Sequence, residues 1–140
     1  MLELQGTTVA VRATALYNRG ITLLEQGKSE DAMVDLTAAV DLSEAPVSRV
    51  VDSLIMRGDI KERGRDRIGA IEDYTAALAV EGISAEQAAM ALAHRGISRG
   101  FQADIDEAIG DFVAVLKLDG APAEIKAEAR RNMSILKKLS

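Results

Sequence analysis

The chain has 140 residues, 48% of them hydrophobic, which is enough to build one domain with its own core. Its formal net charge of −5 argues against the basic surface that nucleic-acid binding usually needs, and it suits a cytoplasmic domain. Because the chain has no cysteine, disulfides, thiolate metal sites and a cysteine nucleophile are all excluded.

Targeting signals are also missing from the sequence. Residues 1–10 have neither the basic start nor the long apolar run of a signal peptide. No apolar run is long enough to cross a membrane. The sequence therefore predicts a single domain over 1–140, located in the cytoplasm, with no nucleic-acid partner and no membrane partner.

Apolar residues at helical spacing predict a series of helices joined by short turns. Residues 1–6 have no periodic pattern and are expected to form a frayed tail. Thr7 or Thr8 can then cap a helix that runs to about Gln26. Ser29 is expected to cap the second helix, because acidic residues follow it in the first turn.

Later helices begin at proline or at capping residues. Pro46 fits the first turn of the third helix. Ser84 and Gln87 match a capping box, Asp104 is expected to cap the sixth helix in the same way, and residues 100–101 are the predicted turn between them. The third to seventh helices are predicted over about 46–63, 66–80, 85–99, 104–117 and 122–139.

One set of residues recurs three times at a fixed period of 38 residues. Each copy has an Arg-Gly pair, then an Ala, then an Asp followed directly by a large apolar residue. A fixed period of this length is typical of repeat proteins, whose helix pairs pack on their neighbours in a line. The recurring residues are Arg19-Gly20, Ala32 and Asp35-Leu36, then Arg57-Gly58, Ala70 and Asp73-Tyr74, then Arg95-Gly96, Ala108 and Asp111-Phe112.

This pattern resembles tetratricopeptide repeats, in which Gly on one helix faces Ala on the next and a bulky residue follows. The resemblance covers about residues 12–117 and implies an all-α, right-handed superhelical solenoid of antiparallel helix pairs, with about seven helices. Repeats are expected over about 8–44, 46–82 and 84–120, with a capping helix over about 122–139. The period of 38 exceeds the usual one of roughly 34 by about one helical turn, which should change the superhelical pitch.

In each repeat the recurring Arg and Asp lie at equal distances on either side of the predicted turn. Equal distance from the turn means equal height on the two helices of a hairpin. We therefore expect a bidentate Arg–Asp contact in each repeat. Its role should be structural, because a role that recurs in every unit belongs to the repeat itself. The predicted pairs are Arg19–Asp35, Arg57–Asp73 and Arg95–Asp111.

The resemblance also implies a binding groove, because partners of tetratricopeptide repeats usually lie along the first helix of each repeat. Tyr17 and Phe101 have no place in the repeated core pattern. Either Tyr17 packs on the next repeat and Phe101 against a turn, or both are aromatic anchors for a partner. The predicted groove residues are Tyr17, Ile21, Leu24, Asp52, Ile55, Asp59, Met90, Ile97 and Phe101.

Other chemistries have weak support in the sequence. Some family members hold a terminal carboxylate in the groove, but here only Asn18 and His94 lie near that surface, so this clamp is expected to be missing. His94 is the only histidine and has no ligand-spaced carboxylates nearby, so no metal and no cofactor are expected. The basic run 57–67 has no interleaved aromatics and is interpreted as a solvated turn.

The resemblance implies a non-catalytic protein–protein interaction scaffold or adaptor that binds a peptide or helix of a partner in the groove. The groove is expected to be apolar and acidic, which favours a partner with apolar anchors and some basic residues. Two alternatives stay open. One is a self-associating, homo-oligomeric module, and the other is a sensor domain of a larger protein that binds a small ligand or peptide.

Overall fold

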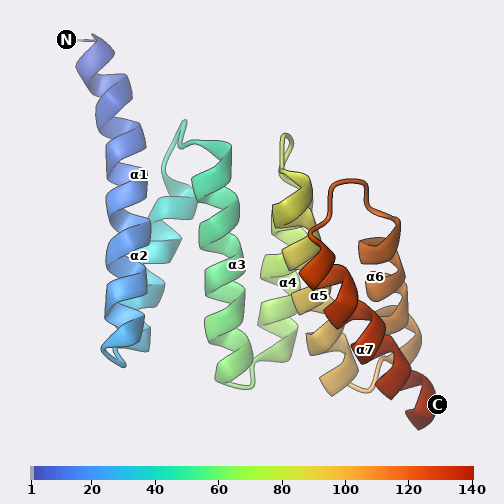
Figure 1. Cartoon of the computed structure of the whole chain (residues 1–140). Helices are drawn as coiled ribbons and strands as arrows, with labels where there is room; N and C mark the ends of the chain where they lie inside the picture. Colours follow the sequence, from blue (N-terminus) through green and yellow to red (C-terminus); the bar gives the residue numbers. More distant parts are fainter. Residues whose placement is uncertain (1) are drawn as a thin grey trace.

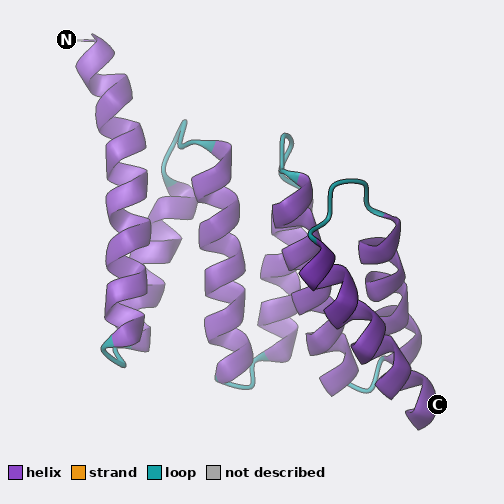
Figure 2. Ribbon diagram, in the orientation of Figure 1, coloured by secondary structure: helices purple, strands orange, loops and turns teal. Residues whose placement is uncertain are grey.

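The computed structural model describes residues 2–140, with side chains from Thr8 onward, and this part of the chain is all-α (Figures 1 and 2). It contains no strand, which confirms the predicted fold class. The described chain forms seven helices: α1 (Leu2–Glu25), α2 (Ser29–Asp41), α3 (Val47–Arg63), α4 (Arg67–Leu78), α5 (Ala85–Phe101), α6 (Ile105–Lys117) and α7 (Ala123–Leu139).

The helices form a curved stack. Each helix packs on the next one along the chain, so α1–α2, α3–α4 and α5–α6 are hairpins set side by side (Figure 1). In addition α1 contacts α3, α3 contacts α5 and α5 contacts α7, whereas no even-numbered helix of the described chain contacts another even-numbered one. The odd-numbered helices are therefore crowded on the inside of the curve. The molecule is a helical solenoid whose concave face is lined by α1, α3, α5 and α7.

Close packing within the second and third hairpins depends on glycine. A Cβ added to Gly58 would lie 2.6 Å from Cε1 of Tyr74, and one added to Gly96 would lie 2.8 Å from Cζ of Phe112. Both aromatic rings are fully buried. Glycine inside a helix costs about 1 kcal/mol relative to alanine, and the close approach of α4 to α3 and of α6 to α5 compensates for that cost.

Some predicted helix starts are wrong. Helix α1 begins at Leu2, so residues 2–6 are helical and not a frayed tail, while Met1 lies outside the described residues. The segment lacks proline, and an established helix propagates through such a segment at little cost. Ser29 is the first residue of α2 and makes no capping hydrogen bond, because the cap position is Lys28.

Residues 100–101 are the last two residues of α5, so they are not the predicted turn. The chain reverses two residues later, at Ala103, which has φ 64°. Arg65 (φ 66°) and Gly27 (φ 77°) occupy the same place in the two earlier hairpins. Each hairpin therefore turns through a left-handed residue at one repeated position, and the turn is built the same way with Gly, Arg or Ala there.

The predicted capping box is only half formed. Ser84 Oγ accepts from the Gln87 backbone N–H at 3.1 Å. The Gln87 side-chain amide instead donates to α3, to the Ser48 carbonyl at 3.0 Å and to Asp52 at 2.8 Å. Asp104 makes no side-chain capping bond, contrary to prediction. The Gln87 amide is thus used to join α5 to α3, because a neighbouring helix offers it two acceptors.

Candidate functional site

Two crevices open on the concave face, between successive odd-numbered helices. The polar crevice, between α3 and α5, has a volume of about 260 Å³, and the apolar crevice, between α5 and α7, about 240 Å³. The polar crevice is lined by Asp59, Glu62, Arg63, Tyr74, His94 and Ile97. The apolar crevice is lined by Gly96, Ile97, Gly100, Phe101, Phe112, Asn132, Ile135, Leu136 and Leu139.

The two crevices are the same site in successive repeats. Each residue that lines the polar crevice has its equivalent, 38 positions further along the chain, in the lining of the apolar crevice. The scaffold is therefore repeated while its chemistry changes from charged to apolar. Isoleucine is kept at Ile97 and Ile135, and the substitutions between the two sites are Asp59 to Ile97, Glu62 to Gly100, Arg63 to Phe101, Tyr74 to Phe112 and His94 to Asn132.

Inside the polar crevice the carboxylates already have internal donors. Asp59 accepts from the Tyr74 hydroxyl at 2.5 Å, and its Oδ1 lies 2.8 Å from Nδ1 of His94. Glu62 accepts from the Ser98 hydroxyl and lies 3.2 Å from Nε of Arg67. The Tyr74 and His94 rings meet edge to face, with centroids 5.7 Å apart. These contacts form a polar network that joins α3, α4 and α5, in which the buried Nε of Arg67 makes an ion pair but no hydrogen bond.

This network shifts the titration of two of its members. Burial of Tyr74 raises its pKa far above the ordinary value, and the hydrogen bond to Asp59 raises the pKa further. Burial alone would lower the pKa of His94. The hydrogen bond and charge of Asp59, together with the charge of Glu128, outweigh burial, so the pKa of His94 lies above its ordinary value. His94 therefore holds its proton more readily here than in water.

At the N-terminal end of the groove, Tyr17 is part of a bridge between repeats. The Arg49 guanidinium lies 5.1 Å from the centroid of the half-buried Tyr17 ring. Arg49 also donates to Asp52 at 3.0 Å. Burial and the nearby charge of Asp52 raise the pKa of Tyr17. Tyr17 packs against α3 of the next repeat, and its ring is only partly available to a partner.

Most predicted groove residues lie on the odd-numbered helices with half-buried side chains, but two differ from expectation. Ile55 is only 4% exposed and packs in the core with Val51, Leu54 and Tyr74, so it does not line the groove surface. The sequence pattern identifies the face of the helix, whereas the depth of packing comes from the neighbouring repeat. Phe101 is 64% exposed at the end of α5, with the Arg67 guanidinium 4.6 Å from its ring centroid. The half-buried groove residues are Tyr17, Ile21, Leu24, Asp52, Asp59, Met90 and Ile97.

The Arg–Asp residues of each hairpin lie in contact, away from the two crevices. Nε and Nη2 of Arg57 donate to Asp73 at 3.0 and 2.8 Å, and those of Arg95 donate to Asp111 at 3.0 and 2.8 Å. In the first repeat Arg19 donates to Asp35 at 2.6 and 2.7 Å. All three contacts are bidentate, and all three carboxylates are buried.

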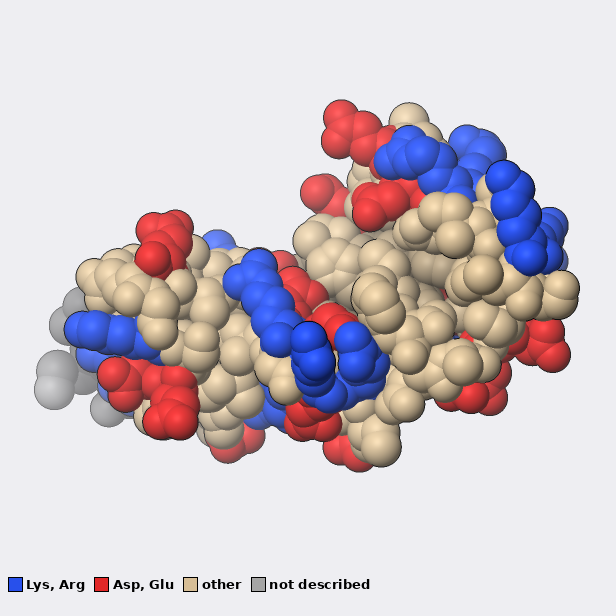
Figure 3. Space-filling view, turned by 90° about the horizontal axis from the view of Figure 1, so that it is seen from below, with Lys and Arg blue, Asp and Glu red and all other residues tan. Residues whose placement is uncertain are grey.

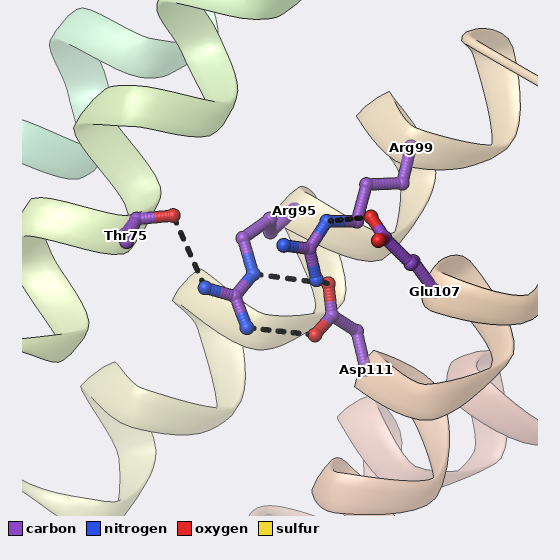
Figure 4. A network of polar contacts seen from close by, with 5 residues as sticks. All are labelled: Thr75, Arg95, Arg99, Glu107 and Asp111. Carbon is purple, nitrogen blue, oxygen red and sulfur yellow. Dashed lines mark hydrogen bonds and ion pairs between the residues drawn. The ribbon is translucent and has the colours of Figure 1, made fainter. Parts of the chain in front are cut away.

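Sequence reasoning missed further partners in these contacts. Asp73 also pairs with Lys61 at 3.0 Å, and Asp111 also pairs with Arg99 at 2.9 Å (Figure 4). The guanidinium of Arg95 reaches back to Thr75 of the preceding repeat at 3.1 Å, as Figure 4 shows. The repeat period could have revealed these extra cations, because Lys61 and Arg99 are 38 residues apart and so occupy the same position in successive repeats.

Arg57 makes the equivalent link to Thr37 at 3.2 Å. The next positions in the 38-residue period are Val113 and Met133, so Thr and Arg are both replaced there. Arg57 and Arg95 therefore each join three helices: their own, the second helix of their hairpin and the second helix of the repeat before.

No group of three or more potential metal ligands occurs within the described part of the chain. None of its helices is long and apolar enough to cross a membrane. The basic run 57–67 is not a solvated turn for most of its length, because residues 57–63 belong to α3, and three of its cations lie against carboxylates of the same chain. These are Arg57 and Lys61 on Asp73, and Arg67 on Glu62.

Comparison with known proteins finds similar solved structures but no match by sequence. No protein-family model matches the chain, and no curated protein matches it. The second TPR of Spaghetti (RPAP3), bound to the HSP90 peptide SRMEEVD, superposes with a TM-score of 0.67 at 23% identity, covering 84% of this chain and 95% of that one. The first TPR of Spaghetti (RPAP3), bound to the same peptide, has a TM-score of 0.71 at 23% identity, covering 91% and 95%. The chain therefore has the tetratricopeptide-repeat fold.

Proposed function

We propose that the chain is a non-catalytic interaction module that binds a segment of a partner protein along its concave groove. The apolar crevice carries this proposal. Phe101, Ile135 and Leu139 meet there and are 64%, 57% and 70% exposed. Large apolar side chains that gather around a concavity on a protein surface are typical of a binding site.

The structural neighbours support the peptide-binding class, because both are TPR domains bound to a peptide. The partner of this chain should have bulky apolar anchors, with the strongest one in the apolar crevice. The expected basic residues of the partner have weaker support, because Asp52, Asp59 and Glu62 are each held by donors of the same chain. A carboxylate that is already paired has less attraction left for a ligand.

A groove variant and a matched surface variant test this function. Ile97 lines both crevices, so Ile97→Asp should abolish capture of peptides from a random 12-residue display library. Val34→Asp makes the same kind of change at an exposed site on the outer helix α2 and should leave capture unchanged. Circular dichroism checks that both variants fold. Equal capture by Ile97→Asp and the unaltered chain would rule out the groove.

Self-association is the rival use of the same surface, since a second copy could cover Phe101, Ile135 and Leu139. Under the proposed function the chain stays monomeric when it is concentrated, and light scattering at several concentrations measures this. A dimer that Ile97→Asp dissociates would instead assign the groove to a homo-oligomer.

A further inference from the structure

We propose that the C-terminal end of the stack is a second interaction surface, which docks an acidic amphipathic helix of a partner protein against α7. This helix would occupy the place that the second helix of a fourth hairpin would fill. It would set a leucine-sized side chain over Ser134 and a carboxylate beside Lys137. The surface is separate from the groove, and the proposal does not depend on the groove function.

A hollow of about 360 Å³ between α6 and α7 marks this surface. Its place in the repeat is known, because every lining residue has equivalents one and two repeats earlier. The lining residues are Leu116, Arg130, Met133, Ser134 and Lys137, which correspond to Leu78, Leu92, Arg95, Gly96 and Arg99 one repeat earlier and to Val40, Leu54, Arg57, Gly58 and Lys61 two repeats earlier. We call the four α7 residues of this lining, together with Lys126, the outer face of α7.

In both earlier repeats the second helix of the hairpin covers these positions. Tyr74 of α4 packs on Gly58, and Asp73 beside it pairs with Arg57 and Lys61. Helix α6 covers α5 through the equivalent residues. No helix of the described chain takes this place on α7, which is the last helix of the stack (Figure 1). A face that is covered in two hairpins is therefore open to a partner here.

The outer face has charges of one sign. Lys126, Arg130 and Lys137 are separated by four and seven residues, a spacing that places them on one side of a helix. None of these side chains has an ion pair or a hydrogen bond with the rest of the described residues. In the hairpins, the residues equivalent to Lys137 bind the aspartate of the second helix. Lys137 thus keeps the cationic half of a helix–helix contact whose acidic half is missing.

Acidic residues near α7 do not cancel this charge. Glu128 acts on His94 in the polar crevice, and Glu124 precedes it by four residues, so both lie on the groove side of α7. Asp106 and Asp119, at the two ends of α6, pair with none of the outer-face cations. Figure 3, a view from below, shows blue side chains gathered at the right-hand end, which is the C-terminal end of the stack. The uncommitted charge of this end is positive and attracts a carboxylate.

Ser134 determines the size of the apolar residue that fits above it. A Cβ added to Gly58 would lie 2.6 Å from the rigid Tyr74 ring, so an aromatic residue has no room above a residue that has a side chain. A Cβ added to Gly20 would lie 3.1 Å from the end of Leu36, which can move by the small amount required. Ser134 therefore favours leucine or methionine in the partner over an aromatic residue.

Helix α2 of this chain has the same combination and supplies a probe. Leu36 follows directly after Asp35, and the exposed residues Glu30, Asp31 and Asp41 make the helix acidic. A synthetic peptide of residues 28–42 with blocked ends therefore presents the required pair in helical register. Short helices are marginal in water, so we expect weak binding, with a Kd of about 1 mM or somewhat below.

Titration of the isotope-labelled chain with this peptide, followed by NMR, tests the proposal. The amide signals of Met133, Ser134 and Lys137 should shift, and Ile97→Asp, which alters the groove, should bind the peptide as the unaltered chain does. Shifts confined to α1 or to the groove, loss of binding in Ile97→Asp, or no shift at all would overturn the docking surface.

Charge variants test the role of Lys137. Lys137→Glu should weaken peptide binding about fivefold, because an attraction becomes a repulsion at the surface. Lys138→Glu makes the same charge change on the next residue, turned away from the outer face, and should bind the peptide nearly as well as the unaltered chain. A peptide with Asp35→Lys should recover binding to Lys137→Glu. Equal affinity of the two charge-reversed chains, or no recovery, would overturn the assigned pair.

A size variant tests the role of Ser134. A peptide with Leu36→Phe should bind poorly to the unaltered chain and better to Ser134→Gly, which restores the glycine of the earlier repeats. Circular dichroism checks that the variants fold. The same preference for Leu over Phe in both chains would exclude Ser134 as the residue that selects the apolar side chain.

Discussion

Gly20 and Gly58 occupy the same repeated position but face different neighbours. A Cβ at Gly58 would lie 2.6 Å from the rigid Tyr74 ring, whereas one at Gly20 would lie 3.1 Å from the flexible end of Leu36. Alanine has the better helix propensity by about 1 kcal/mol, and overpacking costs about 1–3 kcal/mol. We expect Gly58→Ala to lower the free energy of unfolding by about 1 kcal/mol in urea titration. Gly20→Ala should leave it unchanged or raise it, and equal losses would contradict the packing argument.

His94 should make the stability of the fold depend on pH. Its pKa is above the ordinary value of 6.5 in the folded chain, so the charged form is stabilised by folding. This contribution is fully present below pH 6.5 and is lost as the pH rises through the folded pKa. The free energy of unfolding should fall over that interval, and His94→Gln should flatten the fall. An unchanged pH slope in the variant would exclude His94 as its source.

At the scale of the helix, the Thr–Arg links join one hairpin to the one before it. Thr37 on α2 and Arg57 on α3 are 3.2 Å apart, and the link is absent where Val113 and Met133 occupy the same positions. Thr37→Val and Arg57→Met should therefore be coupled by about 1 kcal/mol in a double-mutant cycle of urea unfolding. Thr75→Val with Arg57→Met shares no contact and should be additive, and similar coupling in both cycles would refute the link.

Helix positions could be predicted to within a few residues because the period aligns three copies of the same hairpin. The meeting of Arg57 with Asp73 also follows from the sequence, since it depends only on equal distance from one turn. Contacts between one repeat and the next were harder to predict from the sequence. Ile55 is buried and Asp59 is engaged by His94, and both results depend on how deeply α5 packs on α3. The period does not determine that depth.

The same limit applies to the site. The concave face could be inferred from the resemblance, yet the difference between the two crevices was not recognised from the sequence. It can be read only after the structure shows which six repeated positions line a crevice. The extension of α1 to Leu2 was missed because residues 2–6 have no apolar periodicity, although a helix needs none to continue.

On the scale of the whole molecule, each hairpin contacts only its neighbours, so stability should be local. Leu136 is buried in the cluster formed by α5, α6 and α7. Leu136→Ala should cost about 2–5 kcal/mol at that end of the stack. Hydrogen exchange should show lost protection in α6 and α7, with little change in α2. Uniform loss of protection along the chain would mean that the stack unfolds as one unit.

The repeated crevice also bears on how such a chain can acquire a new partner. The packing pairs Gly58–Tyr74 and Gly96–Phe112 recur at both crevices, whereas the position beside them changes from Asp59 to Ile97. Transplanting the groove-lining side chains from one hairpin to the next would move a ligand preference along the molecule and leave its architecture in place. Duplication followed by drift at those few sites is enough to diversify recognition without inventing a fold.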